Sequence, residues 1–299
     1  MDHIPDLRDG LTAPERRVLS RLGERFVKCA DVVDDARGYE ALVGLAQDFR
    51  RRYPLVDGRG NFGSIDDDPP AEARYTEARL APLARALPRF PNLLVNGSGT
   101  IPPHNLREVV AAVIACVDDP GIDVPGLMEH MPGPDFPSGG VIVDRARIRA
   151  AYETGAGAIT LRARSHVEGD SIVVTELPYG VERGGDVGVI RRIADLHFEG
   201  RLRDVWDLSD YSDRGAMGLV IGLRREADPQ TVLDALHAHT SLETTYAVDM
   251  VALVDGEPRR HTLRELIDAF LARRDAGRVR GELQDLADRF GDDRRTSLG

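Results

Sequence analysis

The chain contains 299 residues, of which 42% are hydrophobic and 30% are charged, and this composition suffices for about two domains with buried cores. No stretch approaches the roughly 20 consecutive apolar residues of a membrane helix, and the N-terminus lacks the basic-then-apolar pattern of a secretion signal. We therefore expect a cytoplasmic protein without a membrane partner. Cys29 and Cys116 are too few for a disulfide framework and lack zinc-ligand spacing, so we interpret both as buried thiols.

Charge is unevenly distributed along the chain. The 39 basic and 50 acidic side chains give a net charge of −11, which argues weakly against nucleic acid as a partner. Residues 1–65 nevertheless carry 11 basic and 11 acidic side chains, whereas residues 111–299 carry 23 and 33. Because DNA binding depends on local charge, the first third is where a polyanion could dock.

The N-terminal third has the pattern of several short helices. Thr12 and Glu15 have the spacing of a capping box, which predicts a helix that continues to about Arg25. Apolar residues recur at helical spacing over 26–49, and Gly38 is the expected break between two helices. Three short helices in succession suggest a helix-turn-helix-like unit.

Residues 53–64 read as a short strand that runs into a glycine-rich turn, after which Asp68 is expected to cap a helix over 69–87. Residues 101–105 then introduce an apolar helix that continues through Val117. Beyond Pro120 strands and helices alternate, which predicts a mixed α/β domain. The expected strands are 140–143, 159–164, 171–177, 218–223 and 245–254, the helices are 145–153, 186–199 and 229–238, and two amphipathic patches occupy 263–290.

Residues 58–63, Gly-Arg-Gly-Asn-Phe-Gly, satisfy the GxGxxG pattern of dinucleotide sites. A nucleotide site needs a helix that opens onto the pyrophosphate, but three aspartates and two prolines follow at 66–70, and packed acids would repel that ligand. We therefore interpret the pattern as a tight turn. It lies either beside DNA or a catalytic tyrosine, or serves the fold alone.

Arg74 and Tyr75 form the sharpest chemical motif. A tyrosine can attack a phosphodiester and hold the broken strand as an ester, and an adjacent arginine can stabilise the developing charge. The phenol needs this help because its free pKa is about 10. The alternative is a half-buried packing tyrosine near the start of a helix.

Two arginine clusters could clamp phosphates through forked hydrogen bonds: Arg16 and Arg17 with Arg21, and the run 50–52. Solvated helix faces with partial salt bridges are the alternative. The histidines show no HxxxH or HExxH spacing, so the sequence predicts no metal site.

A set of ordered segments forms one recognisable pattern: 8–11 with 16–19, 26–30, 52–64, 74–80, 90–98, 101–106, 131–137, 175–179 and 290–295. These segments resemble those of the gyrase-A-type component of bacterial DNA gyrase and topoisomerase IV. The resemblance implies an α+β fold with a truncated winged-helix-like DNA breakage-reunion domain at 1–105, an α/β tower at 106–262 and a remnant of a coiled-coil arm at 263–299.

The same resemblance implies one component of a type IIA topoisomerase. In that family the tyrosine that matches Tyr75 forms a 5′-phosphotyrosyl link and the arginine that matches Arg74 assists it, while Arg16, Arg17 and Lys28 match positions on the DNA-contacting face. The implied partners are double-stranded DNA and a B-type subunit. ATP and Mg²⁺ belong to that B-type partner, so this chain itself is expected to bind neither cofactor, and it is expected to be associated with the nucleoid.

The chain also departs from the family pattern. Stretches are missing between Arg37 and Tyr39, with catalytic histidines, between Gly99 and Ile101, with an intercalating isoleucine, and between about residues 274 and 281, with most of the coiled-coil arm. The alternative is therefore an impaired paralogue that modulates the authentic enzyme by binding DNA or the B-type partner. A winged-helix transcription factor would leave the α/β domain unused. Whether the chain forms a homodimer, and whether it favours supercoiling or decatenation, stay open.

Overall fold

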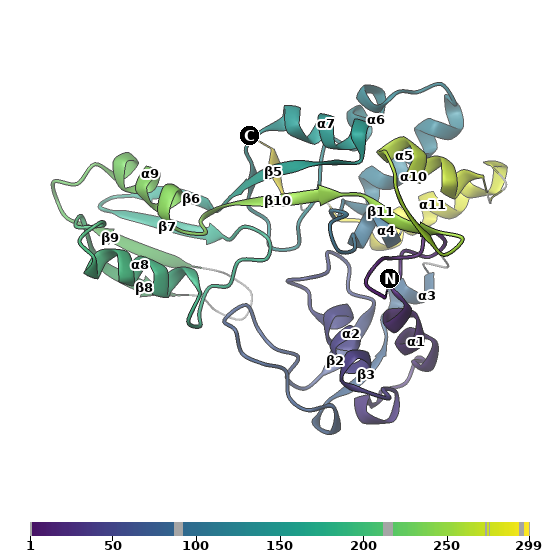
Figure 1. Cartoon of the computed structure of the whole chain (residues 1–299), viewed down its shortest axis with the longest axis horizontal. Coiled ribbons are helices and arrows are strands. Elements are labelled where there is room, and N and C mark those ends of the chain that lie inside the picture. Colours follow the sequence, from purple (N-terminus) through teal and green to yellow (C-terminus); the bar gives the residue numbers. More distant parts are fainter. Residues whose placement is uncertain are drawn as a thin grey trace.

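The computed structural model describes residues 2–86, 92–211, 218–272, 274, 276–292 and 296–298. The N-terminal part packs short helices beside a three-stranded antiparallel sheet of order β1-β3-β2. Its elements are α1 (Ala13–Arg21), β1 (Val27–Lys28), the 3-10 helix η1 (Cys29–Asp31), α2 (Ala36–Ala46), β2 (Val56–Arg59), the 3-10 helix η2 (Ala73–Tyr75), β3 (Glu77–Leu80), α3 (Pro82–Ala86) and α4 (Asn92–Asn96). Figure 1 shows most of these elements below the rest of the molecule.

The predicted start of α1 is confirmed, but the predicted end of this helix near Arg25 and the predicted helix break at Gly38 are wrong. The Glu15 carboxylate accepts hydrogen bonds from the Thr12 backbone N–H at 2.8 Å and from its hydroxyl at 2.9 Å, although the helix ends at Arg21. Gly38 does not break a helix. It lies in the first turn of α2, where its N–H donates to the side chain of the N-cap Asp35 at 2.7 Å.

Of the helix expected over 69–87, only the part Pro82–Ala86 forms, as α3, among the described residues of that range. Residues 69–72 are irregular, and Glu77–Leu80 is a strand that lies between β1 and β2. Pairing on both sides outweighs the local helical pattern, because β-structure depends on neighbouring strands more than on local propensity. Asp68 caps no helix and instead accepts a hydrogen bond from the Ser64 hydroxyl at 2.9 Å.

A large hydrophobic core connects the N-terminal part to the middle and the end of the chain. One cluster of buried side chains includes Leu42, Leu94, Val113, Ile148 and Leu266. The further elements around it are α5 (Leu106–Asp118), α6 (Val124–His130), β4 (Val141–Ile142), α7 (Arg145–Thr154), β5 (Ala156–Arg162), β10 (Glu243–Asp249), β11 (Val251–Val254), β12 (Glu257–Arg260), α10 (Leu263–Leu271), α11 (Ala276–Phe290) and β13 (Ser297–Leu298). The domain boundaries at 105 and 262 stay predictions.

A second core lies at the far end of the long strands β5 and β10 (Figure 1). This core lies between a sheet and two helices, α8 (Val189–Phe198) and α9 (Pro229–His239). The sheet is antiparallel, with the strand order β6-β7-β9-β8. Alternate residues, Ile172 and Val174 on β7 and Leu219 and Ile221 on β9, turn toward the apolar faces of these helices. The strands are β6 (Arg164–Glu168), β7 (Ser171–Glu176), β8 (Val205–Asp210) and β9 (Leu219–Leu223).

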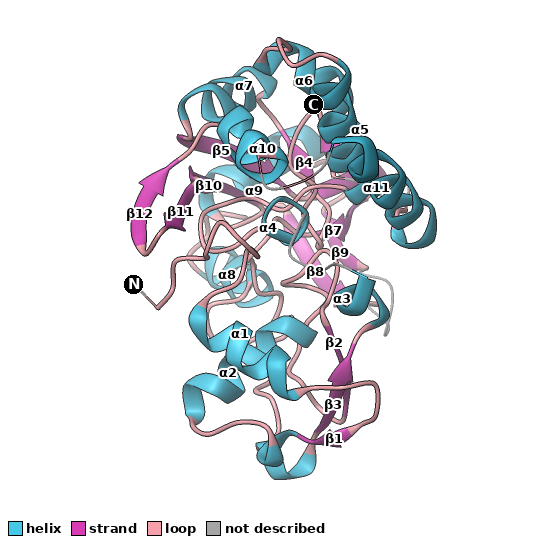
Figure 2. Cartoon of the chain, turned by 90° about the vertical axis from the view of Figure 1, so that its right-hand side faces the viewer, coloured by secondary structure: helices cyan, strands magenta, loops and turns pink. Residues whose placement is uncertain are grey.

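The alternation predicted beyond Pro120 is confirmed in outline, so the chain is a mixed α and β protein. Each of the three helices expected there forms, whereas α6, most of β6, β8, β12 and β13 were not predicted. The two amphipathic patches of the tail are α10 and α11, and α11 packs against α5 (Figure 2). Residues 293–295 of the last family motif, and 90–91 of another, lie outside the described residues. Within the described ranges no helix is both long and apolar enough to cross a membrane.

Candidate functional site

Tyr75 is the last residue of η2, separated from β3 only by Thr76, and 70% of its surface is exposed. The ring is therefore free to meet a ligand. The alternative of a half-buried packing tyrosine at a helix start does not describe this position, because no α-helix begins here.

The backbone beneath the exposed ring is tightly held. The Tyr75 N–H donates to the carbonyl oxygen of Glu72 at 2.8 Å. The next residue, Thr76, is fully buried, and its hydroxyl lies 3.0 Å from the Tyr39 hydroxyl, which also donates to the carbonyl oxygen of Ala71. A nucleophile benefits from this arrangement, because a fixed backbone reduces the freedom that must be lost when the ring is aligned with a substrate.

The glycine-rich turn lies against the tyrosine, as one of our two interpretations of the GxGxxG pattern predicts. Gly60 has φ +105°, and a Cβ atom at this position would lie 3.1 Å from the carbonyl oxygen of Tyr75. Only glycine combines this conformation with so close an approach. Residues 61–72 contain no helix, so the turn has no helix N-terminus to offer a pyrophosphate.

Arg74 accompanies the tyrosine and is held only loosely. Its Nε lies 2.6 Å from the Oε2 atom of Glu72, and its guanidinium carbon lies 5.4 Å from the centre of the Tyr75 ring. The side chains of Arg74 and Glu72 are 66% and 65% exposed. Exposed ion pairs contribute roughly 0–1 kcal/mol, so Arg74 can exchange its carboxylate for a phosphate at little cost.

Further positive charge lies beside the start of β3. Lys28 on β1 and Arg59 on β2 both pair with Glu77, so the three side chains share one face of the sheet. Lys28 is exposed, and the Arg59 guanidinium stacks on the Phe26 ring with 3.8 Å between its carbon and the ring centre. We did not single out Arg59 from the sequence, although its place in the turn next to Gly60 is a usable signal.

The other two predicted DNA contacts lie on α1. Arg16 forms two bonds with the carboxylate of Asp9, at 2.6 and 2.8 Å, and these bonds raise the pKa of Arg16 above its ordinary value. Arg17 is exposed beside a cavity of about 290 Å³ that is also lined by Val33 and Asp35. The structure thus places Lys28 opposite Glu77, two residues after Tyr75, whereas Arg16 forms an ion pair with Asp9. Their DNA contacts stay predictions.

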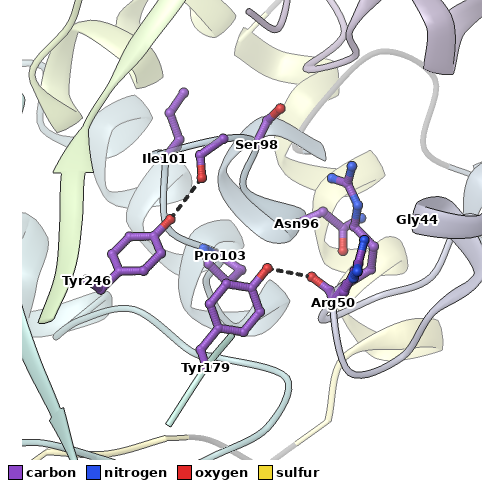
Figure 3. A pocket seen from close by; sticks show the side chains of 10 residues that line it. Gly44, Arg50, Asn96, Ser98, Ile101, Pro103, Tyr179 and Tyr246 are labelled. Carbon is purple, nitrogen blue, oxygen red and sulfur yellow. Dashed lines mark hydrogen bonds between the residues drawn. The ribbon is translucent and has the colours of Figure 1, made fainter. Parts of the chain in front are cut away.

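The arginines at 50–52 are mostly structural, which fits neither the phosphate clamp nor a solvated helix face. Arg52 is 1% exposed and ion-paired, and Arg51 pairs with Glu15. Arg50 is exposed and lines a cavity of about 170 Å³ with Arg51 (Figure 3). Tyr179 also lines this cavity, and its hydroxyl donates to the carbonyl oxygen of Arg50 at 2.9 Å (Figure 3).

The described cysteines and acidic side chains are not arranged as the ligands of a metal ion. Cys29 and Cys116 are buried free thiols, as predicted. In the part of the chain that the structure describes, no three His, Cys, Asp or Glu side chains gather as metal ligands would. Beside Tyr75, the acids Glu72 and Glu77 lie within ion-pair distance of Arg74 and Arg59.

Comparison with known proteins supports a single family. The model of the gyrase-A-type family, which covers DNA gyrase and topoisomerase IV, matches residues 3–87 and 86–284. The gyrase A protein of Halalkalibacterium halodurans is 39% identical over 90% of this chain and 38% of its own length. The gyrase A protein of Escherichia coli K12 is 39% identical over 91% of this chain and 37% of its own length. The chloroplastic/mitochondrial gyrase A protein of Arabidopsis thaliana is 37% identical over 90% and 34%.

The match is extensive along this chain but partial along its relatives. The chain spans less than two fifths of the length of these curated relatives. The alignment with the first covers 324 positions, more than the 299 residues here, so the relative contains stretches that have no counterpart in this chain. Since the family model covers most of the sequence, the chain belongs to the gyrase-A-type family of DNA gyrase and topoisomerase IV.

Proposed function

We propose that this chain is a shortened gyrase-A-type component of a type IIA DNA topoisomerase, which binds double-stranded DNA and transiently cleaves and rejoins it through Tyr75. The observation that carries the proposal is the exposed Tyr75 ring on a fixed backbone, in a chain of the gyrase A family. Lys28, Arg59 and Arg74 supply positive charge for the DNA backbone beside it.

The chemistry is one reversible transesterification. The Tyr75 phenol oxygen attacks a backbone phosphorus, the new P–O bond forms, and the bond to the 3′ oxygen breaks. The products are a 5′-phosphotyrosyl ester and a 3′-hydroxyl, which receives the proton that the phenol loses. Arg74 leaves Glu72 and binds the nonbridging oxygens, where negative charge is greatest in the transition state. Attack by the 3′-hydroxyl reverses each change and rejoins the strand.

Mg²⁺ and ATP are proposed to be bound by a B-type partner, and this chain contributes neither site. Mg²⁺ would supply charge stabilisation at the scissile phosphate. The described acids next to Tyr75 face arginines, so a metal here would have to displace Arg74 or Arg59 from its carboxylate. Association with DNA would place the protein at the nucleoid.

The test is a DNA-cleavage assay with Mg²⁺ and a B-type subunit, stopped with denaturant to trap protein on DNA. We expect a covalent adduct with the native chain and none with Tyr75→Phe. Tyr211→Phe is the matched control, because Tyr211 is similarly exposed, at 73%, but directly follows β8 and is distant in sequence from the turn and strand around Tyr75. An adduct that persists in Tyr75→Phe would refute the assignment of the nucleophile.

A second function is favoured by the missing stretches, since the aligned relatives contain segments that this chain lacks. An impaired paralogue would bind DNA or the B-type partner without forming an adduct. It would then inhibit supercoiling when added to an authentic gyrase. Absence of both inhibition and binding would eliminate this alternative.

A further inference from the structure

The segment that joins the glycine-rich turn to Tyr75, residues 61–71, leaves the small sheet and reaches the second core (Figure 1). Ile65 packs against that core, and its carbonyl oxygen accepts the Arg183 N–H at 2.9 Å. Thus a residue distant in sequence meets the chain ten residues before the tyrosine.

Arg183 also binds this segment through its side chain. Its Nε lies 2.6 Å from the Oδ1 atom of Asp66, and its Nη2 contacts the Oδ2 atom, so the pair is bidentate. The Arg183 side chain is only 14% exposed, and Asp210 on β8 lies 3.5 Å from its other nitrogen. Partial burial and two parallel bonds make this contact stronger and more directional than an ordinary surface pair.

The backbones beside this ion pair are also in contact. A Cβ atom at Gly184 would lie 3.1 Å from the carbonyl oxygen of Asp66, and one at Gly185 would lie 2.8 Å from the Cβ atom of Asp67. Asp67 has φ +66°, a conformation that a residue with a side chain adopts rarely. The closest point of the loop is therefore held in a defined shape against the second core.

From this anchor, hydrogen bonds across the segment lead back to the tyrosine. The Ser64 N–H donates to the carbonyl oxygen of Asp68 at 3.2 Å, and the Ala71 N–H donates to that of Asn61 at 3.0 Å. The Ala71 carbonyl in turn accepts from Tyr39, the residue that also contacts Thr76 beside Tyr75. A displacement at Asp66 would thus be transmitted to the backbone on which the phenol is carried.

We propose that Arg183 is a positioning residue for Tyr75: its ion pair with Asp66 anchors residues 61–71 to the second core and so fixes where the phenol is presented. This inference rests on the proposed function for its effect on cleavage. The anchoring itself is a property of the chain alone, so the two can fail separately.

The first measurement is hydrogen exchange of the intact chain without DNA, comparing native protein with Arg183→Ala, Arg183→Lys and Asp66→Asn. We expect the amides of Ser64 and Ala71 to exchange about tenfold faster in Arg183→Ala and Asp66→Asn, a change that corresponds to roughly 1.4 kcal/mol. Arg183→Lys, which keeps the charge without the fork, should lie between these variants and the native chain. Arg149→Ala, which breaks the ion pair with Glu153 on α7, is the matched control and should change neither amide.

The second measurement is adduct formation at saturating DNA with Mg²⁺ and a B-type subunit. A misplaced phenol lowers the rate of cleavage and leaves DNA affinity nearly unchanged, so we expect about a tenfold lower rate with an unchanged dissociation constant. Asp66→Asn is nearly isosteric and serves as the test if Arg183→Ala fails to fold.

The outcomes separate the two ideas. Unchanged exchange at Ser64 and Ala71 overturns the anchoring, whatever the activity. Faster exchange with an unchanged cleavage rate overturns the positioning role. If the native chain forms no adduct with a competent partner, the proposed function fails, and the exchange result alone decides whether Arg183 anchors the segment.

Discussion

Replacing Arg52 by methionine would remove the central member of a buried charge cluster while keeping a side chain of similar length. Arg52 and Asp135 are each 1% exposed, and the Arg52 Nε lies 2.7 Å from the Asp135 carboxylate. A second carboxylate, that of Asp292, lies 2.5 Å from an Arg52 nitrogen and is 48% exposed. Burial opposes the charged form of Arg52, but the bond to Asp292 and the attraction of Asp135 raise its pKa above the ordinary value.

The expected loss of stability depends on the hydrogen bonds that Asp135 keeps after Arg52 is replaced. Removing one partner of a buried ion pair costs about 3–5 kcal/mol, because an uncompensated charge stays in the interior. Asp135 still accepts the Thr296 N–H at 2.8 Å and the Asn105 amide at 3.3 Å. We therefore expect Arg52→Met to lower the free energy of unfolding by about 3 kcal/mol, near the lower end of that range.

Urea unfolding followed by circular dichroism measures this loss, with two comparisons. Asp135→Asn in the Arg52→Met background should recover part of the stability, because it removes the buried charge. Arg147→Met, which breaks an exposed ion pair between α7 and its N-cap residue Asp144, should change stability by less than about 1 kcal/mol. A loss below about 1 kcal/mol in Arg52→Met, or no recovery in the double variant, would refute the reasoning.

Three further predictions concern the site and the buried thiols. Gly60→Ala should destabilise the chain by about 1–2 kcal/mol and slow cleavage, because the methyl group would press on the Tyr75 carbonyl; Gly169→Ala, also at positive φ (+61°) but with open space around it, should cost less in the same urea titration and leave cleavage unchanged. Arg74→Ala should lower the cleavage rate by about 10²-fold with nearly native stability, and a rate equal to that of the native chain would contradict its role. Burial raises the pKa of Cys116 to about 11. The neutral thiol therefore stabilises the folded chain fully below the ordinary thiol pKa of about 8.5, and this contribution is lost as pH rises toward 11. Cys116→Ala should show a smaller decline in the free energy of unfolding over this range.

The elements that the sequence predicted well are those whose burial follows their own period. On β7, Ile172 and Val174 alternate with more exposed residues, and the apolar face of α8 has helical spacing. The prediction of a helix at Glu77–Leu80 was wrong because strand formation there depends on pairing with β1 and β2, which the local pattern does not reveal. The prediction of a helix break at Gly38 was wrong because the Asp35 side chain, three residues earlier, accepts the Gly38 N–H. This cap makes glycine acceptable at the start of a helix.

The candidate site divides in the same way. Tyr75, Arg74 and the glycine-rich turn are contiguous or nearly so, and their motif located them together. The ion pair between Arg16 and Asp9 requires knowledge of the path of the chain before α1. Arg183 had no local signal at all, because its partner Asp66 lies 117 positions away in the sequence.

At two of the places where the resemblance implies missing family stretches, the chain is closed by ordinary local structure, and this bears on which of the proposed functions it has. At residues 98–101, Ser98 and Ile101 form a backbone bridge, and Gly97 and Gly99 adopt φ +62° and +60° to make the turn. The start of α2 is capped by Asp35. Ile101 and Leu42 beside these closures are buried in the main core, so the packing around both closures is intact. A negative cleavage assay would therefore be explained by the loss of side chains that act on DNA, and an unfolded N-terminal part would not be needed to explain it.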